Sequence, residues 1–215
     1  MDGLHFIYFA DPMCSWCWGF SPVVETLRAR YGEILPIRLV MGGLRPGTDQ
    51  AMSEEAKQSL RGHWVEIAEL TGQAFGDGPL DHPDFVYNTD PAARAVVLAR
   101  RTSMTAALDL LARLHRAFYA EGRDIVDRRV IADLAAEQGF DRDAFHSALG
   151  DQSLHEETWR DYAISRKAGV TGFPTLILGP KADGAYALIN RGYGRPDEVT
   201  GVIDRLLATV QPAQA

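Results

Sequence analysis

The sequence predicts an α/β domain that is interrupted by a large all-helical insertion. The chain opens with a strand, a helix and a second strand, and it closes with two strands and a helix. Between these ends lie roughly 110 residues that show helical spacing and no strand pattern. We therefore expect residues 1–44 and 162–215 to form one discontinuous domain and residues 45–161 to form the helical insertion.

The composition is that of an ordinary globular chain, with 46% apolar and 24% charged residues among 215. The net charge of −7 argues against nucleic acid or an anionic membrane as a partner, because both bind basic patches. No apolar run reaches the roughly eighteen residues of a membrane helix. If Met1 is the native start, the absence of a secretion signal predicts a cytoplasmic location.

The opening segment is predicted to form a strand, a helix and a strand. Leu4–Ala10 is a short aromatic and apolar run typical of a buried strand, and an Asp-Pro pair ends it. A helix is expected from about Cys14 to Tyr31, and Pro22 is expected to kink it after its first two turns. Leu35–Met41 is the second expected strand.

The middle of the chain is predicted to be helical because its apolar residues recur every three or four positions. Ser53, Asp127 and Asp141 stand where residues that cap helix starts are expected. The expected helices are Ser53–Thr71, Pro91–Thr102, Thr105–Glu121, Asp127–Gln138 and Asp141–Gly150.

The closing segment returns to the α/β pattern. A helix is expected over Leu154–Ala168, followed by short strands over Leu176–Leu178 and Tyr186–Asn190. A last helix should run from Arg195 to about Val210. This order places the last two strands next to the opening unit.

The only two cysteines of the chain lie three residues apart, as Cys14-Ser15-Trp16-Cys17, at the expected start of the first helix. The positive end of a helix favours a thiolate, so we expect Cys14 to attack a disulfide. Cys17 lies one turn deeper on the same face and is expected to resolve the mixed disulfide. Two inert thiols, a stabilising disulfide or half of a zinc site are the alternatives. Zinc would need two further soft ligands, and no second pair of this kind exists.

Apolar side chains surround the two cysteines. Met13 and Trp16 are expected to form a rim that contacts a peptide substrate, while Trp18 and Phe20 are more simply explained as core. Far along the chain, Phe173-Pro174 stands in a loop that runs directly into a strand, which is a suitable place for a cis proline.

Two motifs together resemble the DsbA family of thioredoxin-fold oxidoreductases, and most closely its FrnE-like branch. They are ADPMCSWCWGF at Ala10–Phe20 and GVTGFPT at Gly169–Thr175. The resemblance spans essentially the whole chain and implies a thioredoxin-like fold with a large helical insertion. It also implies that Pro174 is a cis proline facing the disulfide, that the backbone at Phe173 pairs with substrate, and that no metal or organic cofactor is bound.

One departure from the thioredoxin-fold pattern concerns proton transfer. Many of these enzymes carry a buried acid six positions before the first cysteine, where this chain has Tyr8. Asp11 is nearer, but the proline after it indicates a structural role in a turn. Which group takes the proton of Cys17 is therefore open. Arg191 and Arg195 are candidates for holding an acidic thiol such as glutathione, although a surface role is the simpler explanation.

The predicted function is thiol-disulfide exchange with cysteine-containing proteins or peptides, as oxidation, reduction or isomerisation. A thiol redox partner such as glutathione or a thioredoxin system is expected. One alternative is a glutathione-dependent enzyme similar to kappa-class transferases and hydroxychromene-carboxylate isomerases, which typically carry serine at the position of Cys14. A second alternative is a non-catalytic chaperone or binding module.

Overall fold

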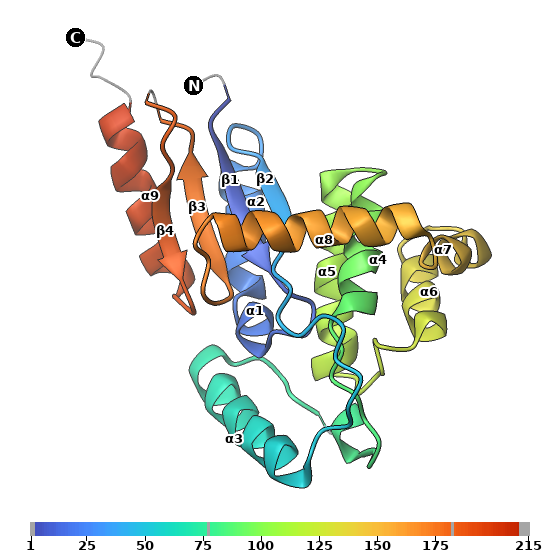
Figure 1. Cartoon of the computed structure of the whole chain (residues 1–215). Coiled ribbons are helices and arrows are strands. Elements are labelled where there is room, and N and C mark those ends of the chain that lie inside the picture. The colour runs from blue at the N-terminus through green and yellow to red at the C-terminus, as the bar shows by residue number, and fades with distance from the viewer. Residues whose placement is uncertain (1–2, 77, 182, 211–215) are drawn as a thin grey trace.

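The computed structural model describes residues 3–76, 78–181 and 183–210 (Figure 1). Its sheet has four strands in the order β2-β1-β3-β4. The parallel pair is β1 (His5–Ala10) and β2 (Ile37–Met41), whereas β3 (Thr175–Gly179) runs antiparallel to β1 and to β4 (Ala187–Arg191). The two ends of the chain thus share one sheet, as the order of expected elements predicts.

The central strand β1 carries the core of this unit. Phe6 and Tyr8 point to the same face as their β3 partners Leu178 and Leu176, and all four side chains are buried. The helices α2 (Ser21–Tyr31) and α9 (Pro196–Val210) contact each other here, and α9 also contacts β4. Residues 1–2, 182 and 211–215 of the expected first domain lie outside the described residues.

The first helix is broken, and the break differs from the predicted kink. The structure has a short α1 (Ser15–Gly19) and a separate α2, with Phe20 between them. Pro22 stands in the first turn of α2, where the missing N–H has no helical partner to lose. The proline therefore helps to start a second helix instead of bending the first, and the prediction of one kinked helix is wrong.

In the described residues between β2 and β3, the chain forms six α-helices and a short 3₁₀ turn (η1). As expected, the hydroxyl of Ser53 and the carboxylate of Asp141 accept hydrogen bonds from backbone N–H groups at helix starts. The elements are α3 (Glu54–Thr71), η1 (Pro79–Asp81), α4 (Asp90–Arg100), α5 (Met104–Tyr119), α6 (Arg128–Glu137), α7 (Arg142–Ala148) and α8 (Gln152–Lys167). Among the residues placed by the structure, none of the helices is long and apolar enough to cross a bilayer.

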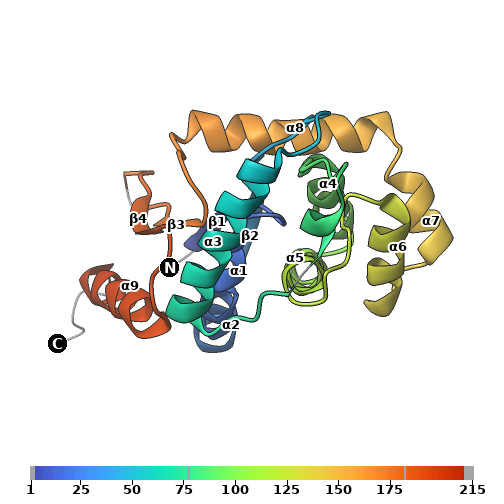
Figure 2. The same ribbon diagram turned by 90° about the horizontal axis from the view of Figure 1, so that it is seen from below.

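The insertion helices form two groups around the sheet. The helix α8 contacts β2 and α4 and reaches across to α7, while α6 packs on α5 (Figures 1 and 2). The helix α3 stands apart from these and packs on α1. Gly19 makes that contact close, since a Cβ there would lie 2.9 Å from the Thr71 methyl group. The helix α8 runs unbroken across the expected boundary at residue 161, and the domain division itself stays a prediction.

A partly buried ion pair ties the helical segment to the sheet. Asp161 on α8 binds the guanidinium of Arg100 on α4 at 2.6 Å and accepts a hydrogen bond of 2.9 Å from the backbone N–H of Met41 on β2. Arg100 also donates to the carbonyl of Leu39 at 3.0 Å. The pair therefore joins two insertion helices to the edge strand of the sheet.

The substitution Asp161→Asn should lower the free energy of unfolding by about 3 kcal/mol, because it leaves the Arg100 charge without its buried partner. Urea denaturation followed by circular dichroism measures this loss. The control is Glu157→Gln, at a more exposed carboxylate of the same cluster, which should cost less than about 1 kcal/mol. Equal losses in the two variants would contradict the proposed role of Asp161.

Candidate active site

The two cysteines lie at the start of α1 and differ in burial. Cys14 is the residue that caps the helix, and its side chain is 6% exposed. Cys17 lies one turn further and has no exposed surface. Both are free thiols in this structure. An incoming disulfide would therefore reach Cys14 before Cys17.

The electrostatic surroundings favour a protonated Cys17. Burial raises the pKa of the Cys17 thiol well above its ordinary value, and the hydrogen bond and charge of Cys14 raise it further. A backbone hydrogen bond from Asp11 acts in the opposite direction. These surroundings thus favour the thiol form of Cys17 over the thiolate.

The loop before β3 meets the first cysteine. The peptide bond between Phe173 and Pro174 is cis, as expected, and the Cys14 sulfur lies 3.5 Å from the Phe173 carbonyl oxygen, to which it donates. The ring of Phe173 lies directly against Gly42, where any Cβ would collide with it. Gly192 donates its N–H to the Pro174 carbonyl at 2.8 Å and so fixes the loop to the end of β4.

The aromatic rim of the site differs in part from the prediction. Trp16 is half-buried, and its ring lies 6.1 Å from that of Tyr193 and 6.4 Å from that of His63 on α3. Met13 is completely buried, and its carbonyl accepts a hydrogen bond from the Tyr87 hydroxyl. The side chain of Met13 therefore gives a substrate no surface, contrary to expectation, because the turn before Cys14 points it inward.

Trp18 and Phe20 belong to the core, which is the simpler of their two interpretations. The rim partners Tyr193 and His63 were not expected from the sequence. They come from segments far from the cysteines along the chain, and nothing in their local sequence distinguishes them from surface aromatic residues.

Asp11 organises the turn that precedes the cysteines. Its buried carboxylate accepts hydrogen bonds from the backbone N–H of Met13 at 3.0 Å and of Leu44 at 2.8 Å. Burial raises its pKa to about 6, although these hydrogen bonds lower it in part. The expected structural role is confirmed, because the carboxylate links the turn to the loop after β2.

Behind this turn, α5 contributes a buried histidine. A ring nitrogen of His115, Nε2, lies 3.1 Å from the Asp11 carbonyl oxygen. Because a carbonyl can only accept, Nε2 carries the hydrogen and Nδ1 is free to accept. Burial lowers the pKa of His115 to about 4, so the imidazole is neutral near pH 7.

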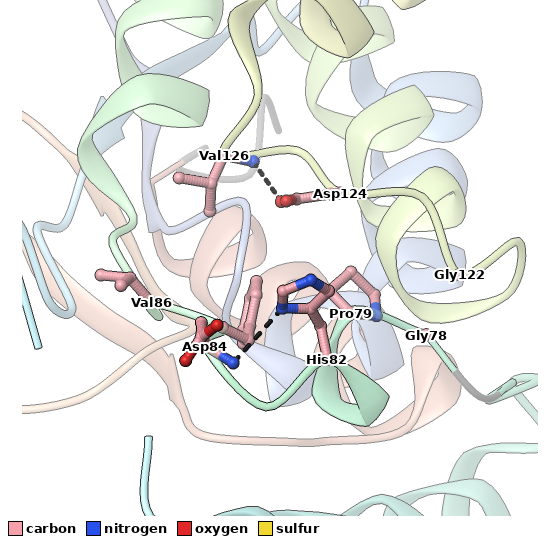
Figure 3. Close-up of a pocket in the computed structure, with 9 residues that line it drawn as sticks. Gly78, Pro79, His82, Asp84, Val86, Gly122, Asp124 and Val126 are labelled. Carbon is pink, nitrogen blue, oxygen red and sulfur yellow. Dashed lines mark hydrogen bonds between the residues drawn. The ribbon is translucent and has the colours of Figure 1, made fainter. Parts of the chain in front are cut away.

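A cavity of about 470 Å³ lies elsewhere, in the helical segment between β2 and β3 (Figure 3). Two of its polar side chains are engaged locally: Asp124 accepts from the N–H of Val126 at 2.9 Å, and His82 accepts from the N–H of Asp84 at 3.3 Å. None of the predicted site residues lines it. Within the described chain no cluster of side chains suits a metal ion. The cysteine turn is thus the better candidate for chemistry.

Comparison with known proteins identifies the family. The model of the DSBA-like thioredoxin domain matches residues 6–190. The chain belongs to this family. Its mixed four-stranded sheet and many helices are therefore a DsbA-like thioredoxin fold, as the sequence predicts.

Solved structures of the family resemble this DSBA-like chain closely. A candidate protein disulfide isomerase from Nitrosomonas europaea has a TM-score of 0.87 and 28% identity, covering 97% of this chain and 99% of its own. The cytosolic disulfide reductase DsbM from Pseudomonas aeruginosa has a TM-score of 0.78 and 30% identity, covering 95% of this chain and 99% of its own. These likenesses support a thiol-disulfide oxidoreductase in general terms.

Curated relatives of the chain are named as adapter proteins, whereas the solved structures above are named as disulfide-exchange enzymes. The ClpXP adapter protein SpxH of Bacillus subtilis is 25% identical over 200 residues, which cover 86% of this chain. The matched part spans 64% of SpxH, so this DSBA-like chain covers less than two thirds of that relative's length.

The substitution His115→Gln should reduce the acid sensitivity of the fold. The unfolded chain binds a proton at His115 near its ordinary pKa, whereas the folded chain binds it only near pH 4. The stability from neutral His115 is therefore complete above about pH 6.5 and is lost as the pH falls toward about 4. Glutamine can keep the donor to Asp11 and does not titrate.

Urea denaturation at about pH 7 and about pH 4.5 measures the unfolding free energy of His115→Gln minus that of the wild type. Between the higher and the lower pH, this difference should change by about 2 kcal/mol in favour of the variant. Asp11 titrates in both proteins and cancels in the comparison. His146→Gln, at an exposed histidine of α7, is the control and should show no such shift. A constant difference between the wild type and His115→Gln at both pH values would contradict the interpretation.

Proposed function

We propose that this protein exchanges disulfides with cysteine-containing proteins or peptides through a Cys14/Cys17 redox pair. The observation that carries the proposal is the placement of Cys14 at a helix start, three residues before the buried Cys17 and beside the Phe173 carbonyl and cis Pro174. Cys14, Cys17 and Pro174 are the proposed catalytic residues. Trp16 and the backbone of Phe173 are the proposed substrate contacts.

The reaction proceeds in two exchanges. The Cys14 thiolate attacks one sulfur of a substrate disulfide, a mixed disulfide forms, and the other substrate sulfur leaves as a thiolate that takes up a proton. The Cys17 thiolate then attacks the Cys14 sulfur and expels the second substrate thiolate. The substrate gains two electrons and the Cys14/Cys17 pair becomes a disulfide. The reverse sequence oxidises a substrate.

Glutathione is the proposed redox partner, since DsbM, at 30% identity, was also solved with GSH. Two glutathione molecules would return the pair to the dithiol and form glutathione disulfide. Arg191 is exposed at the end of β4, opposite Thr175 and thus close to Pro174, where it can meet an anionic thiol. Arg195 is already paired with Glu198 at 3.1 Å. The proposed location is the cytosol, because DsbM is named as a cytosolic disulfide reductase.

The SpxH relatives support a second candidate, a non-catalytic protein-binding role. The half-buried Trp16 between Tyr193 and His63 would then be a docking surface instead of a substrate contact. The two functions differ in one respect: binding would survive the loss of both thiols, whereas disulfide exchange would not.

Equilibration with glutathione buffers, followed by alkylation and mass measurement, tests the redox pair. We expect a reversible disulfide with a potential within the glutathione poise of about −220 to −260 mV. Cys14→Ser should abolish exchange. Cys17→Ser should accumulate a mixed disulfide that adds the mass of one glutathione, because the resolving thiol is missing. A pair that never forms a disulfide would favour the binding role.

A further inference from the structure

In the second exchange, the buried Cys17 has to act as the nucleophile. Its thiol has no exposed surface, and it must lose its proton before it attacks the Cys14 sulfur. Both oxygens of the Asp11 carboxylate already accept hydrogen bonds from backbone N–H groups and so hold the turn. His115 donates its Nε2 hydrogen to the Asp11 carbonyl. A further protic group close to the buried sulfur is therefore a candidate for this transfer.

Tyr8 is that group. It lies on the central strand β1, its side chain is only 2% exposed, and its ring centroid is 6.0 Å from that of Phe20, just after α1. Burial raises the pKa of the Tyr8 phenol well above its ordinary value, and its interactions with the nearby Cys17 and Cys14 thiols raise it further. The hydroxyl therefore stays protonated and can donate to a thiolate.

A narrow crevice connects Tyr8 with the surface. It lies between α2 and α5 and has about 10 Å³ of free space, which is room for about one water molecule. Its polar lining consists of Tyr8, Ser21, Glu25 and His115. Glu25 is exposed and His115 presents an acceptor nitrogen, so a water there has the several polar partners that a bound water needs.

We propose that Tyr8 is a catalytic residue that takes the place of the buried acid: its hydroxyl relays the proton of Cys17 into the crevice and then stabilises the thiolate. Cys17 gives its proton to the Tyr8 oxygen while Tyr8 gives its own to the crevice water. Tyr8 is left neutral, with its new O–H donating to the Cys17 sulfur. The thiolate attacks Cys14, and the expelled substrate thiolate takes a proton from solvent. The inference rests on the proposed redox pair.

Other titratable groups face this region and belong in any account of its pH dependence. They come from the turn after β1, from α1, from α2, from α5 and from the loop before α4. They are Asp11, Cys14, Glu25, His115, Tyr119 and Tyr87.

A single stopped-flow trace separates the two cysteines. An aromatic disulfide reagent that releases coloured nitrothiobenzoate gives one equivalent when Cys14 attacks it and a second when Cys17 resolves the adduct. The variant Cys17→Ser, which should lose the second phase, assigns the phases. The test variant is Tyr8→Phe, which keeps the ring and removes the hydroxyl. The control is Tyr31→Phe, at a tyrosine whose hydroxyl binds Asp204 at 2.6 Å.

We expect Tyr8→Phe to slow the second phase about tenfold and to move its pH midpoint up by about one unit, the effect of losing one hydrogen bond to a charged group. The first phase should not change. Tyr31→Phe should leave both phases unchanged, and thermal unfolding verifies that both variants are folded. An unchanged second phase, or equal slowing of both phases, would overturn the role of Tyr8. A wild type that releases only one equivalent would instead overturn the redox pair, and this inference with it.

Discussion

The carboxylate of Asp11 is the constraint on which the arrangement of the site depends. The strand β1 must end and the chain must turn within a few residues for α1 to start with Cys14 at its N-terminus. Asp11 stabilises this turn with its side chain, which binds the N–H groups of Met13 and Leu44, and with its carbonyl, which accepts from Cys14 at 3.1 Å and from His115. One residue thereby fixes the cysteine turn to the loop after β2 and to α5.

This fixed turn gives two identical side chains different surroundings, as the roles proposed for them require. A helix rises about 1.5 Å per residue, so three residues separate Cys14 from Cys17 by less than one turn. That short distance takes the chain from the rim into a core in which Cys17 has no exposed surface. The burial of Cys17 raises the cost of ionising it, which is consistent with the proposal that Cys14 makes the first attack.

Local signals in the sequence were sufficient for the overall fold. The cysteine spacing, the caps Ser53 and Asp141, and the loop at Phe173-Pro174 each depend on neighbours within a few residues, and the structure has the expected elements there. The break at Phe20 was missed because the sequence around Pro22 is compatible both with a proline that kinks a long helix and with a proline in the first turn of a new helix. The sequence alone could not decide where the second helix begins.

The walls of the site were harder to predict, because long-range packing determines them. The burial of Met13 depends on Tyr87, and the rim beside Trp16 depends on His63 and Tyr193. No periodicity or motif connects such distant positions. The role proposed for Tyr8 is of the same kind: its position was noticed as a departure from the family pattern, but only the crevice between α2 and α5 suggests what the hydroxyl does.

The helical segment between β2 and β3 is therefore part of the site. It contributes His63 to the rim, Tyr87 and His115 to the buried side of the cysteine turn, and one wall of the crevice. The ion pair of Asp161 with Arg100 holds α4 and α8 against β2 and thereby helps to fix the position of the surrounding helices relative to the sheet. The strands and α1 provide the thiols and the cis proline, while in the proposed reaction the surrounding helices would control how protons and substrates reach them.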